Sequence, residues 1–422
     1  MGEMSLHALG IIAIFLVGYV FIILEHLTKI NKTPIAILMA VLAWTLLFTD
    51  ATCPLAGSLL CLGKHIADVS QLIFFLLGAL TIIEIVNIHR GFNVVADWIR
   101  VTSKRKLLWT TAWMAFFLSS VLDNLTTTLV MVTLLRQLID DRETRWILGG
   151  AVVIAANAGG AWTPIGDVTT TMLWIGGQLS TGGILTSLFL PSVVCLAVSL
   201  LVLTPLLEGN FVRSKAQEQH FVSPLSKTIF YFGVGALIFV PFFKAITGLP
   251  PFMGMLFGVS AIWIFTDVMH KGHGDREHLK VPCALSKVDL SSTLFFLGIL
   301  LCVNALDTAH ILEKLAHWLN QAVHNDTLIA TLLGLFSAVI DNVPLVAASM
   351  GMYDLSIYIQ DASFWKLIAY CAGTGGSILM IGSAAGVIYA GMEEISFNWY
   401  VKRMSLPALC GYFSGIIVYL LI

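Results

Sequence analysis

The chain has 422 residues, of which 58% are hydrophobic and only 11% are charged, whereas a soluble globular protein carries about 25% charged residues. This composition excludes a soluble globular protein and indicates a polytopic membrane protein. The formal net charge of −2 implies no acidic partner such as nucleic acid.

Apolar segments long enough to cross about 30 Å of hydrocarbon recur along the chain. In chain order they are 9–25, 34–48, 69–88, 146–177, 184–207, 228–247, 251–268, 289–306, 364–392 and 405–422. The first segment lacks a basic leader and a small-residue cleavage pattern, so we interpret it as a span and not as an intact signal peptide. The sequence therefore predicts an all-α polytopic membrane protein with about ten spans.

Two further stretches, 107–138 and 327–353, each hold two short apolar arms separated by an Asp-Asn pair. An arm of about 15 residues forms a helix of about 22 Å, which is too short to span comfortably. We interpret both stretches as re-entrant hairpins; two short full spans in each are the alternative. The tips would carry Asp123 and Asp341 into the membrane, where a lone carboxylate costs several kcal/mol. We expect the two acids to lie close together near the midplane.

The Lys and Arg residues predict the orientation. In this arrangement 19 of the 23 Lys and Arg residues lie on one side of the membrane. They fall in segments 25–33, 89–106, 136–145, 208–227, 269–287 and 393–404. The other four are Lys64, Lys244, Lys314 and Lys366. The positive-inside rule assigns the first set to the cytoplasm. Both termini and the loop 49–68 are then predicted to face outward.

Three features of the first half recur in the second half in the same order. The matched pairs are Phe75–Gly78 with Phe295–Gly298, Asp123-Asn124 with Asp341-Asn342, and Asn157–Asp167 with Gly373–Ser383. Segments 69–88 and 289–306 run in opposite directions, so the repeats are inverted, an architecture of secondary transporters with interrupted helices and a midplane site. The predicted units are N-terminal scaffold spans 1–68, a first repeat 69–207, linking spans with a cytoplasmic loop 208–288, and a second repeat 289–422.

The interrupted segments predict a site for a small cation. A broken helix frees carbonyl oxygens, which are hard ligands, and capping side chains add further oxygens. Burial disfavours the charged form of a carboxylate, so either a proton or a metal cation can neutralise it, but not both together. Competition between the two would suffice for exchange. Simple helix capping is the structural alternative for Asp123, Asp341 and Asp167, and Glu84 is either a proton-access group or an interfacial acid.

Four motifs carry a family resemblance: S-x-x-L-D-N-x-T-T-T, A-N-A-G-G-x-W-T-P-I-G-D-V-T-T, I-D-N-V-P and G-T-G-G-S-x-L-x-I-G-S-A-A-G. With them the chain, from about residue 10 to its end, resembles the NhaD-type sodium/proton antiporters of the ion transporter superfamily. The resemblance implies Na⁺ or Li⁺ efflux coupled to H⁺ entry, a role in pH homeostasis, no cofactor beyond the transported ions, and commonly a homodimer. The residues it implicates are Asp123, Asn124, Asn157, Asp167, Thr169, Thr170, Ser337, Asp341, Asn342 and Ser377. The second half departs from the first at Gly373, which stands where its repeat mate has Asn157, and this weakens the case for Na⁺ ligation there.

Other functions remain open at the level of sequence. A sodium-coupled carboxylate transporter of the same superfamily is the nearest, but the acids at both tips would repel an anion and suit a cation and a proton. An intramembrane aspartyl protease is a remote alternative, since two membrane Asp residues can share a proton. We predict that the chain is not an enzyme. Because two acids occupy equivalent positions, we favour two protons per Na⁺ and an electrogenic cycle.

Three further hypotheses concern single features. Cys53 and Cys61 share one predicted loop and could pair if that loop faces an oxidising compartment. The segment with His270, His273 and His278 could sense pH or bind a metal, although a solvated loop is the simpler interpretation. The expected location is the bilayer of a bacterial inner membrane.

Overall fold

The computed structural model describes residues 6–49, 55–99, 101–211, 223–271 and 279–422. In these ranges the regular structure is helical, apart from one isolated bridge between Ser103 and Asn210. Seven described helices are long and apolar enough to cross a membrane, or eight if the bent pair α20–α21 is one span. The prediction of an all-α polytopic membrane protein is confirmed, while the exact number of spans stays a prediction.

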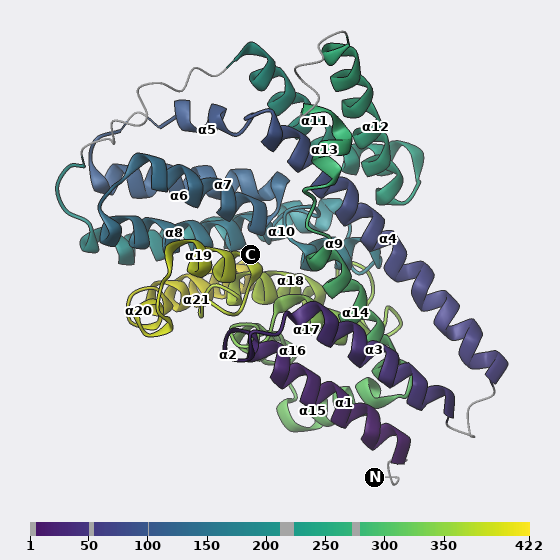
Figure 1. Cartoon of the computed structure of the whole chain (residues 1–422). Coiled ribbons are helices and arrows are strands. Elements are labelled where there is room, and N and C mark those ends of the chain that lie inside the picture. Colours follow the sequence, from purple (N-terminus) through teal and green to yellow (C-terminus); the bar gives the residue numbers. More distant parts are fainter. Residues whose placement is uncertain (1–5, 50–54, 100, 212–222, 272–278) are drawn as a thin grey trace.

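One group of helices, which we call the scaffold group, packs along one side of the molecule (Figure 1). Within it α3 packs on α1 and α14, α4 packs on α12 and α14, and α11 packs on α12. Its long members are α1 (Leu6–Ile23), α3 (Lys32–Thr49), α4 (Leu55–Ile88), α11 (Pro224–Thr247), α12 (Pro251–His270) and α14 (Leu290–Thr308). The short helices α2 (Glu25–Thr28) and α13 (Val281–Leu285) connect members of this group, and α5 (Asn93–Asp97) follows α4 on the way to α6.

The remaining long helices form a second group, which we call the bundle. In it α6 packs on α8, α16 packs on α18, and α10 packs on α21. Its members are α6 (Lys104–Leu122), α7 (Asn124–Leu138), α8 (Arg142–Gly160), α9 (Val168–Ile175), α10 (Thr181–Leu203), α16 (Asp326–Phe336), α17 (Asn342–Met352), α18 (Ser363–Gly375), α19 (Ala384–Glu393) and α21 (Ser405–Leu421). The 3₁₀ turn η1 (Thr204–Leu206) follows α10.

The helices break where the sequence predicts. One helix ends at Leu122 and the next begins at Asn124, and the second Asp-Asn pair likewise starts α17 after the end of α16. Residues 161–167 interrupt the span that contains α8 and α9, and residues 376–383 interrupt α18 and α19. Entry of both hairpins from opposite membrane faces stays a prediction.

Glycines allow the same close helix contact in both halves. A Cβ atom on Gly159 would lie 2.1 Å from the carbonyl oxygen of Phe116, and one on Gly375 would lie 2.0 Å from that of Gly334. Any larger residue would therefore push α8 away from α6, or α18 away from α16. The second arms pack crosswise, since α7 contacts α19 and α17 contacts α9. Each Asp-Asn break is thus held against an interrupted helix of the other half.

The structure corrects three loop predictions. Helix α4 begins at Leu55, inside the segment 49–68 that we expected to be a loop, because the apolar run from Leu55 to Leu62 continues the helix. The segments after α14 and before α21 contain helices α15 (Ile311–Val323) and α20 (Phe397–Arg403). Helix α15 buries only Leu312 and Ala316, so it lies on the surface and was too amphipathic to be identified as a span.

The predicted Cys53–Cys61 pair lies partly outside the described residues and stays a prediction. Cys61 is a free thiol in α4 with its Sγ 3.6 Å from the hydroxyl of Thr308, while Cys53 lies outside the described residues.

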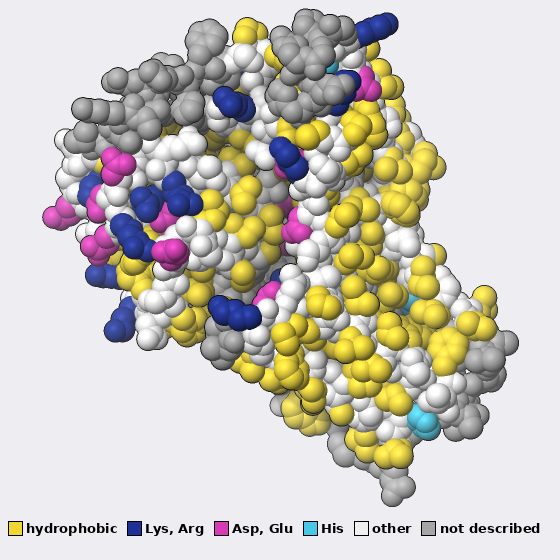
Figure 2. Space-filling view, viewed as in Figure 1, with side chains coloured by type: hydrophobic (Ala, Val, Ile, Leu, Met, Phe, Trp, Pro, Cys, Tyr) yellow, Lys and Arg dark blue, Asp and Glu magenta, His cyan; other side chains and the backbone are white. Residues whose placement is uncertain are grey.

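Figure 2 shows hydrophobic side chains covering much of the visible surface, with most Lys and Arg side chains gathered toward the left. An apolar surface of this kind suits contact with lipid.

Candidate functional site

The carboxylate of Asp167 is the point at which the two Asp-Asn breaks meet. Asn124 of α7 and Asn342 of α17 both donate to its Oδ2 atom, at 3.2 Å and 3.3 Å. Its Oδ1 atom accepts the backbone N–H of Thr169 at 3.2 Å, so Asp167 also caps α9. The residue is only 2% exposed. The structure thus brings Asp167 into contact with the asparagine of each Asp-Asn pair.

The charge of Asp167 has no cationic partner in the described ranges. Its hydrogen-bond donors are two amide groups and a backbone N–H, all of them neutral. No Lys, Arg or His described in the structure forms an ion pair with it. A buried carboxylate without a counter-charge is strongly disfavoured. A proton or a small cation at this position would neutralise the carboxylate.

Asn157 connects the site across the two halves of the chain. Its Oδ1 atom accepts from Asn124 at 3.0 Å, and its Nδ2 atom donates to Ser377 at 2.8 Å and Ser383 at 3.0 Å. The side chain is fully buried. Asn157 thereby fixes the hydroxyls of the second interrupted segment relative to the first tip. These oxygens are ligands of the type that a hard cation prefers.

The space that corresponds to Asn157 in the second half lies beside the central carboxylate. A Cβ atom on Gly373 would sit 3.6 Å from Oδ2 of Asp167 and 3.3 Å from the Cβ atom of Ala161. The departure from the repeat therefore leaves room next to this oxygen, where a side chain as large as Asn would crowd it. The lack of a side chain at Gly373 therefore leaves space beside the Asp167 carboxylate.

Asp123 is held by its own helix. Thr126 donates its backbone N–H to Oδ1 at 2.7 Å and its hydroxyl to Oδ2 at 3.2 Å. The backbone of Asp123 has φ 83° and ψ 163°, a region that favours glycine. No described basic residue forms an ion pair with this carboxylate. Asp123 is a capping residue with an unbalanced charge.

Asp341 has a basic partner that sequence reasoning missed. Its Oδ2 atom lies 3.6 Å from the Nζ atom of Lys32 at the start of α3. Its own cap is weak, since Val343 N–H donates to Oδ1 at 3.4 Å. In the sequence Lys32 is one basic residue of a predicted cytoplasmic loop, and nothing in its spacing connects it with the second tip.

The remaining predicted residues divide into those near Asp167 and those elsewhere. Thr170 donates to the backbone oxygen of Asp167 at 2.9 Å, and Ser337 donates to the carbonyl of Ala372 at 2.8 Å. Glu84 accepts hydrogen bonds from Asn87 on its own helix, and among the described residues no hydrogen bond joins it to the Asp167 cluster. The structure therefore does not join Glu84 to the other candidates.

Two hydroxyls beside the first tip have no hydrogen-bond partner among the described residues. They belong to Thr127 and Thr128, which are fully buried in the first turn of α7. An unpaired buried hydroxyl is costly, and it is a ready oxygen ligand for a cation. Both stand in the T-T-T run that follows Asp123.

A polar cavity of about 480 Å³ lies between α4, α9, α14 and α17. Its polar lining includes Lys64, His65, Asp68, Asn304 and Asp307, in or beside segments predicted to face outward. It reaches α9 and α17, whose first residues follow Asp167 and Asp341. On these two helices it is lined by Met172, Ile175, Ala347, Met350 and Gly351, which follow the two acids further along each helix.

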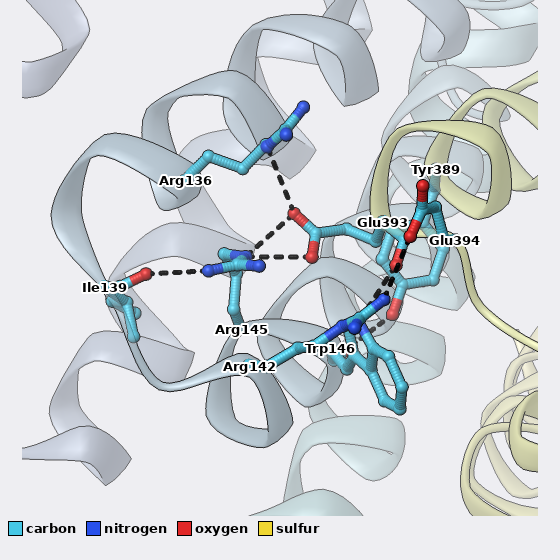
Figure 3. Close-up of polar contacts among 8 residues, drawn as sticks. All are labelled: Arg136, Ile139, Arg142, Arg145, Trp146, Tyr389, Glu393 and Glu394. Atoms are coloured by element: carbon cyan, nitrogen blue, oxygen red, sulfur yellow. Dashed lines mark hydrogen bonds and ion pairs between the residues drawn. The ribbon is translucent and has the colours of Figure 1, made fainter.

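An ion-pair cluster joins three bundle helices at the ends that lie away from the Asp167 cluster (Figure 3). Glu393 at the end of α19 is buried and accepts from Nε of Arg145 on α8, at 2.9 Å and 2.8 Å. Arg136 of α7 lies 3.8 Å from the same carboxylate. Helices α7, α8 and α19 are thus fixed at the ends away from Asn124, Asn157 and Ser383.

The histidine hypothesis needs correction. His270 is buried, with its Nε2 atom 2.9 Å from Nε2 of His89, so it joins α12 to α4 and is not part of a solvated loop. His273 and His278 lie outside the described residues. Among the described residues no group of three or more His, Cys, Asp and Glu side chains could hold a metal ion.

Known proteins are similar to this chain over nearly its whole length. The family model described as "Citrate transporter" matches residues 19–364. The chain is 52% identical to sodium/proton antiporter 1 of Arabidopsis thaliana over 96% of its own length and 71% of that protein. It is 51% identical to sodium/proton antiporter 2 of the same plant, covering 96% and 98% of the two chains.

A bacterial relative extends the comparison. The Na⁺/H⁺ antiporter NhaD of Vibrio cholerae is 30% identical over 97% of this chain and 90% of that protein. The resemblance to NhaD-type proteins is therefore confirmed. The chain belongs to the citrate transporter family of membrane transporters, together with the relatives that are named sodium/proton antiporters.

Proposed function

We propose that this protein exchanges Na⁺ or Li⁺ for H⁺ across a membrane, by competition of the two ions at Asp167 and the neighbouring tips. The observation that carries the proposal is the buried carboxylate of Asp167, which accepts only neutral donors from both Asp-Asn breaks. Relatives that cover nearly the whole chain are named sodium/proton antiporters, which supports the same activity.

The exchange follows from charge balance. A proton on Asp167 neutralises the carboxylate and removes its attraction for Na⁺, and loss of the proton restores it. The amide of Asn124 and the hydroxyls held by Asn157 supply neutral oxygens around the same centre. The proposed ligands are Asp123, Asn124, Asn157, Thr169, Thr170, Ser337, Asp341, Asn342 and Ser377, with Asp167 as the shared proton and cation site.

A carboxylate substrate is the second candidate, since the matching family model is described by citrate. An organic anion would have to approach three acidic residues, Asp123, Asp167 and Asp341. The basic side chain that the described residues place near them, Lys32, is already paired with Asp341. The electrostatics of the site therefore favour a cation.

Further features belong to the same proposal. We assign residues 69–207 and 289–422 to inverted repeats, 1–68 to N-terminal spans and 208–288 to linking spans with a cytoplasmic loop. The matched glycine contacts of α8 and α18 support the two repeats. A homodimer in a lipid bilayer and a role in pH homeostasis remain predictions. So does a bacterial inner membrane, since the plant relatives are more similar to this chain than the bacterial ones reported above.

The test is Na⁺-driven proton movement in proteoliposomes that contain the purified protein. Wild type should acidify or alkalise the lumen according to the direction of the Na⁺ gradient, and Asp167→Asn should fall to the level of empty liposomes. Asp140→Asn, at an exposed acid, is the matched control and should remain active. Absence of Na⁺-driven proton movement in the wild type would overturn the proposal. If Asp167→Asn exchanges ions at the wild-type rate, Asp167 is not the exchange site.

A further inference from the structure

Lys32 is held in place from several sides. Its Nζ atom lies 3.6 Å from Asp341 and 4.3 Å from the ring centre of Phe295, and its backbone N–H donates to Glu25 at 3.1 Å. The Lys32 and Asp341 side chains are 25% and 14% exposed. A partly buried ion pair interacts more strongly than an exposed one, because water screens it less.

The two partners belong to different groups of helices. Lys32 begins α3 of the scaffold group, whereas Asp341 caps α17 of the bundle. Phe295 on α14 places its ring beside the ammonium group, so the lysine is directed by the scaffold. An ion that displaces Lys32 from Asp341 therefore removes one attraction between the scaffold and the second tip.

We propose that Lys32 is an internal cation that competes with Na⁺ for Asp341. It occupies the carboxylate when no Na⁺ is bound and separates from it when Na⁺ binds at the second tip. The inference rests on the proposed function and extends it, because it makes the two tips unequal. The carboxylates of the first tip and of Asp167 have no cationic partner among the described residues. At the second tip, Na⁺ replaces the ammonium group of Lys32 beside Asp341.

The test compares Na⁺ binding and transport in three variants. Lys32→Gln removes the charge, Lys32→Arg keeps it, and Lys29→Gln removes the charge of an exposed lysine in the same connection. Calorimetric Na⁺ binding to purified protein and the Na⁺ dependence of proton flux in proteoliposomes are measured for each. Lys32→Met replaces Lys32→Gln if the latter does not elute as folded protein in size-exclusion chromatography.

Lys32→Gln should bind Na⁺ about fivefold or more tightly, because its competitor is gone. Its maximum rate should fall, because Na⁺ leaves more slowly. Lys32→Arg should approach wild type in both, and Lys29→Gln should match it. A change of affinity within about twofold for Lys32→Gln, or weaker Na⁺ binding, would overturn the inference.

The readouts separate this inference from the proposed function. If wild type binds Na⁺ but moves no protons with it, antiport fails, and the binding comparison still decides the role of Lys32. If wild type exchanges ions and Lys32→Gln has unchanged affinity, only the role of Lys32 fails. If wild type shows no Na⁺ binding at all, both are wrong.

Discussion

The two Asp-Asn breaks have the same sequence pattern but different surroundings. Asp123 receives two hydrogen bonds from Thr126 and has no described cationic partner, whereas Asp341 accepts one long bond from Val343 and pairs with Lys32. The local sequence determines which residue caps a helix. Whether the charge of that residue is neutralised depends on the side chains that pack against it from other segments. Equal motifs in a repeat protein therefore need not have equal roles.

This difference bears on stoichiometry. The sequence favoured two protons per Na⁺ because two acids occupied equivalent positions. In the structure the acids are not equivalent, and a third acid, Asp167, lies where both tips converge. The electrogenic cycle stays a prediction, and its second proton can no longer be assigned to Asp341 by symmetry alone.

Neutralising each tip acid should give the largest effect, and the two variants should differ in stability if the two Asp-Asn breaks differ. We expect Asp123→Asn to stop exchange while leaving stability near wild type, because Asn can still cap α7. Asp341→Asn should also impair exchange and should destabilise the protein by about 1–2 kcal/mol, since it leaves Lys32 without its partner. Thermal unfolding in detergent, together with proteoliposome flux, measures both.

A double variant provides the control for that experiment. In Lys32→Gln/Asp341→Asn neither charge remains, so part of the lost stability should return, by a coupling of about 0.5–3 kcal/mol. Additive losses in the double variant would show that the ion pair contributes nothing to stability.

The two tip asparagines should give a smaller and graded effect. Asn124→Ala removes donors to both Asn157 and Asp167, whereas Asn342→Ala removes one donor to Asp167. We expect Asn124→Ala to weaken Na⁺ binding more, with each lost bond to the carboxylate equivalent to about 1.5–3 kcal/mol. Calorimetric Na⁺ titration tests the order. A larger loss in Asn342→Ala would place the dominant tip in the second half.

The smallest effect is expected from Gly373→Ala. Its methyl group would lie 3.6 Å from Oδ2 of Asp167 and 3.3 Å from the Cβ atom of Ala161, so it removes space for water or a cation and requires only a small shift of Ala161. Na⁺ affinity should fall by a few-fold, while the unfolding temperature should change only slightly. Gly375→Ala is the matched contrast, because its Cβ would meet the carbonyl of Gly334 at 2.0 Å and should destabilise the fold. Equal behaviour of the two variants would contradict the assignment of Gly373 to the site.

The sequence by itself determined the properties that arise within a single segment. Hydrophobic length predicted the spans and the Asp-Asn pairs marked the helix breaks, since each depends on residues close together in the chain. The first part of α4, before the predicted span 69–88, and the surface helix α15 were not predicted. Polar residues in that part of α4 and the amphipathic pattern of α15 resemble loop sequence.

Only the tertiary structure decided how the charged residues combine. The position of Asp167 between Asn124 and Asn342 requires three segments to meet, and the pairing of Lys32 with Asp341 joins the two ends of the sequence. Electrostatic energy depends on distance and burial in the folded molecule. Neither is encoded in local spacing, so the central acid and the partner of the second tip emerged only from the packed bundle.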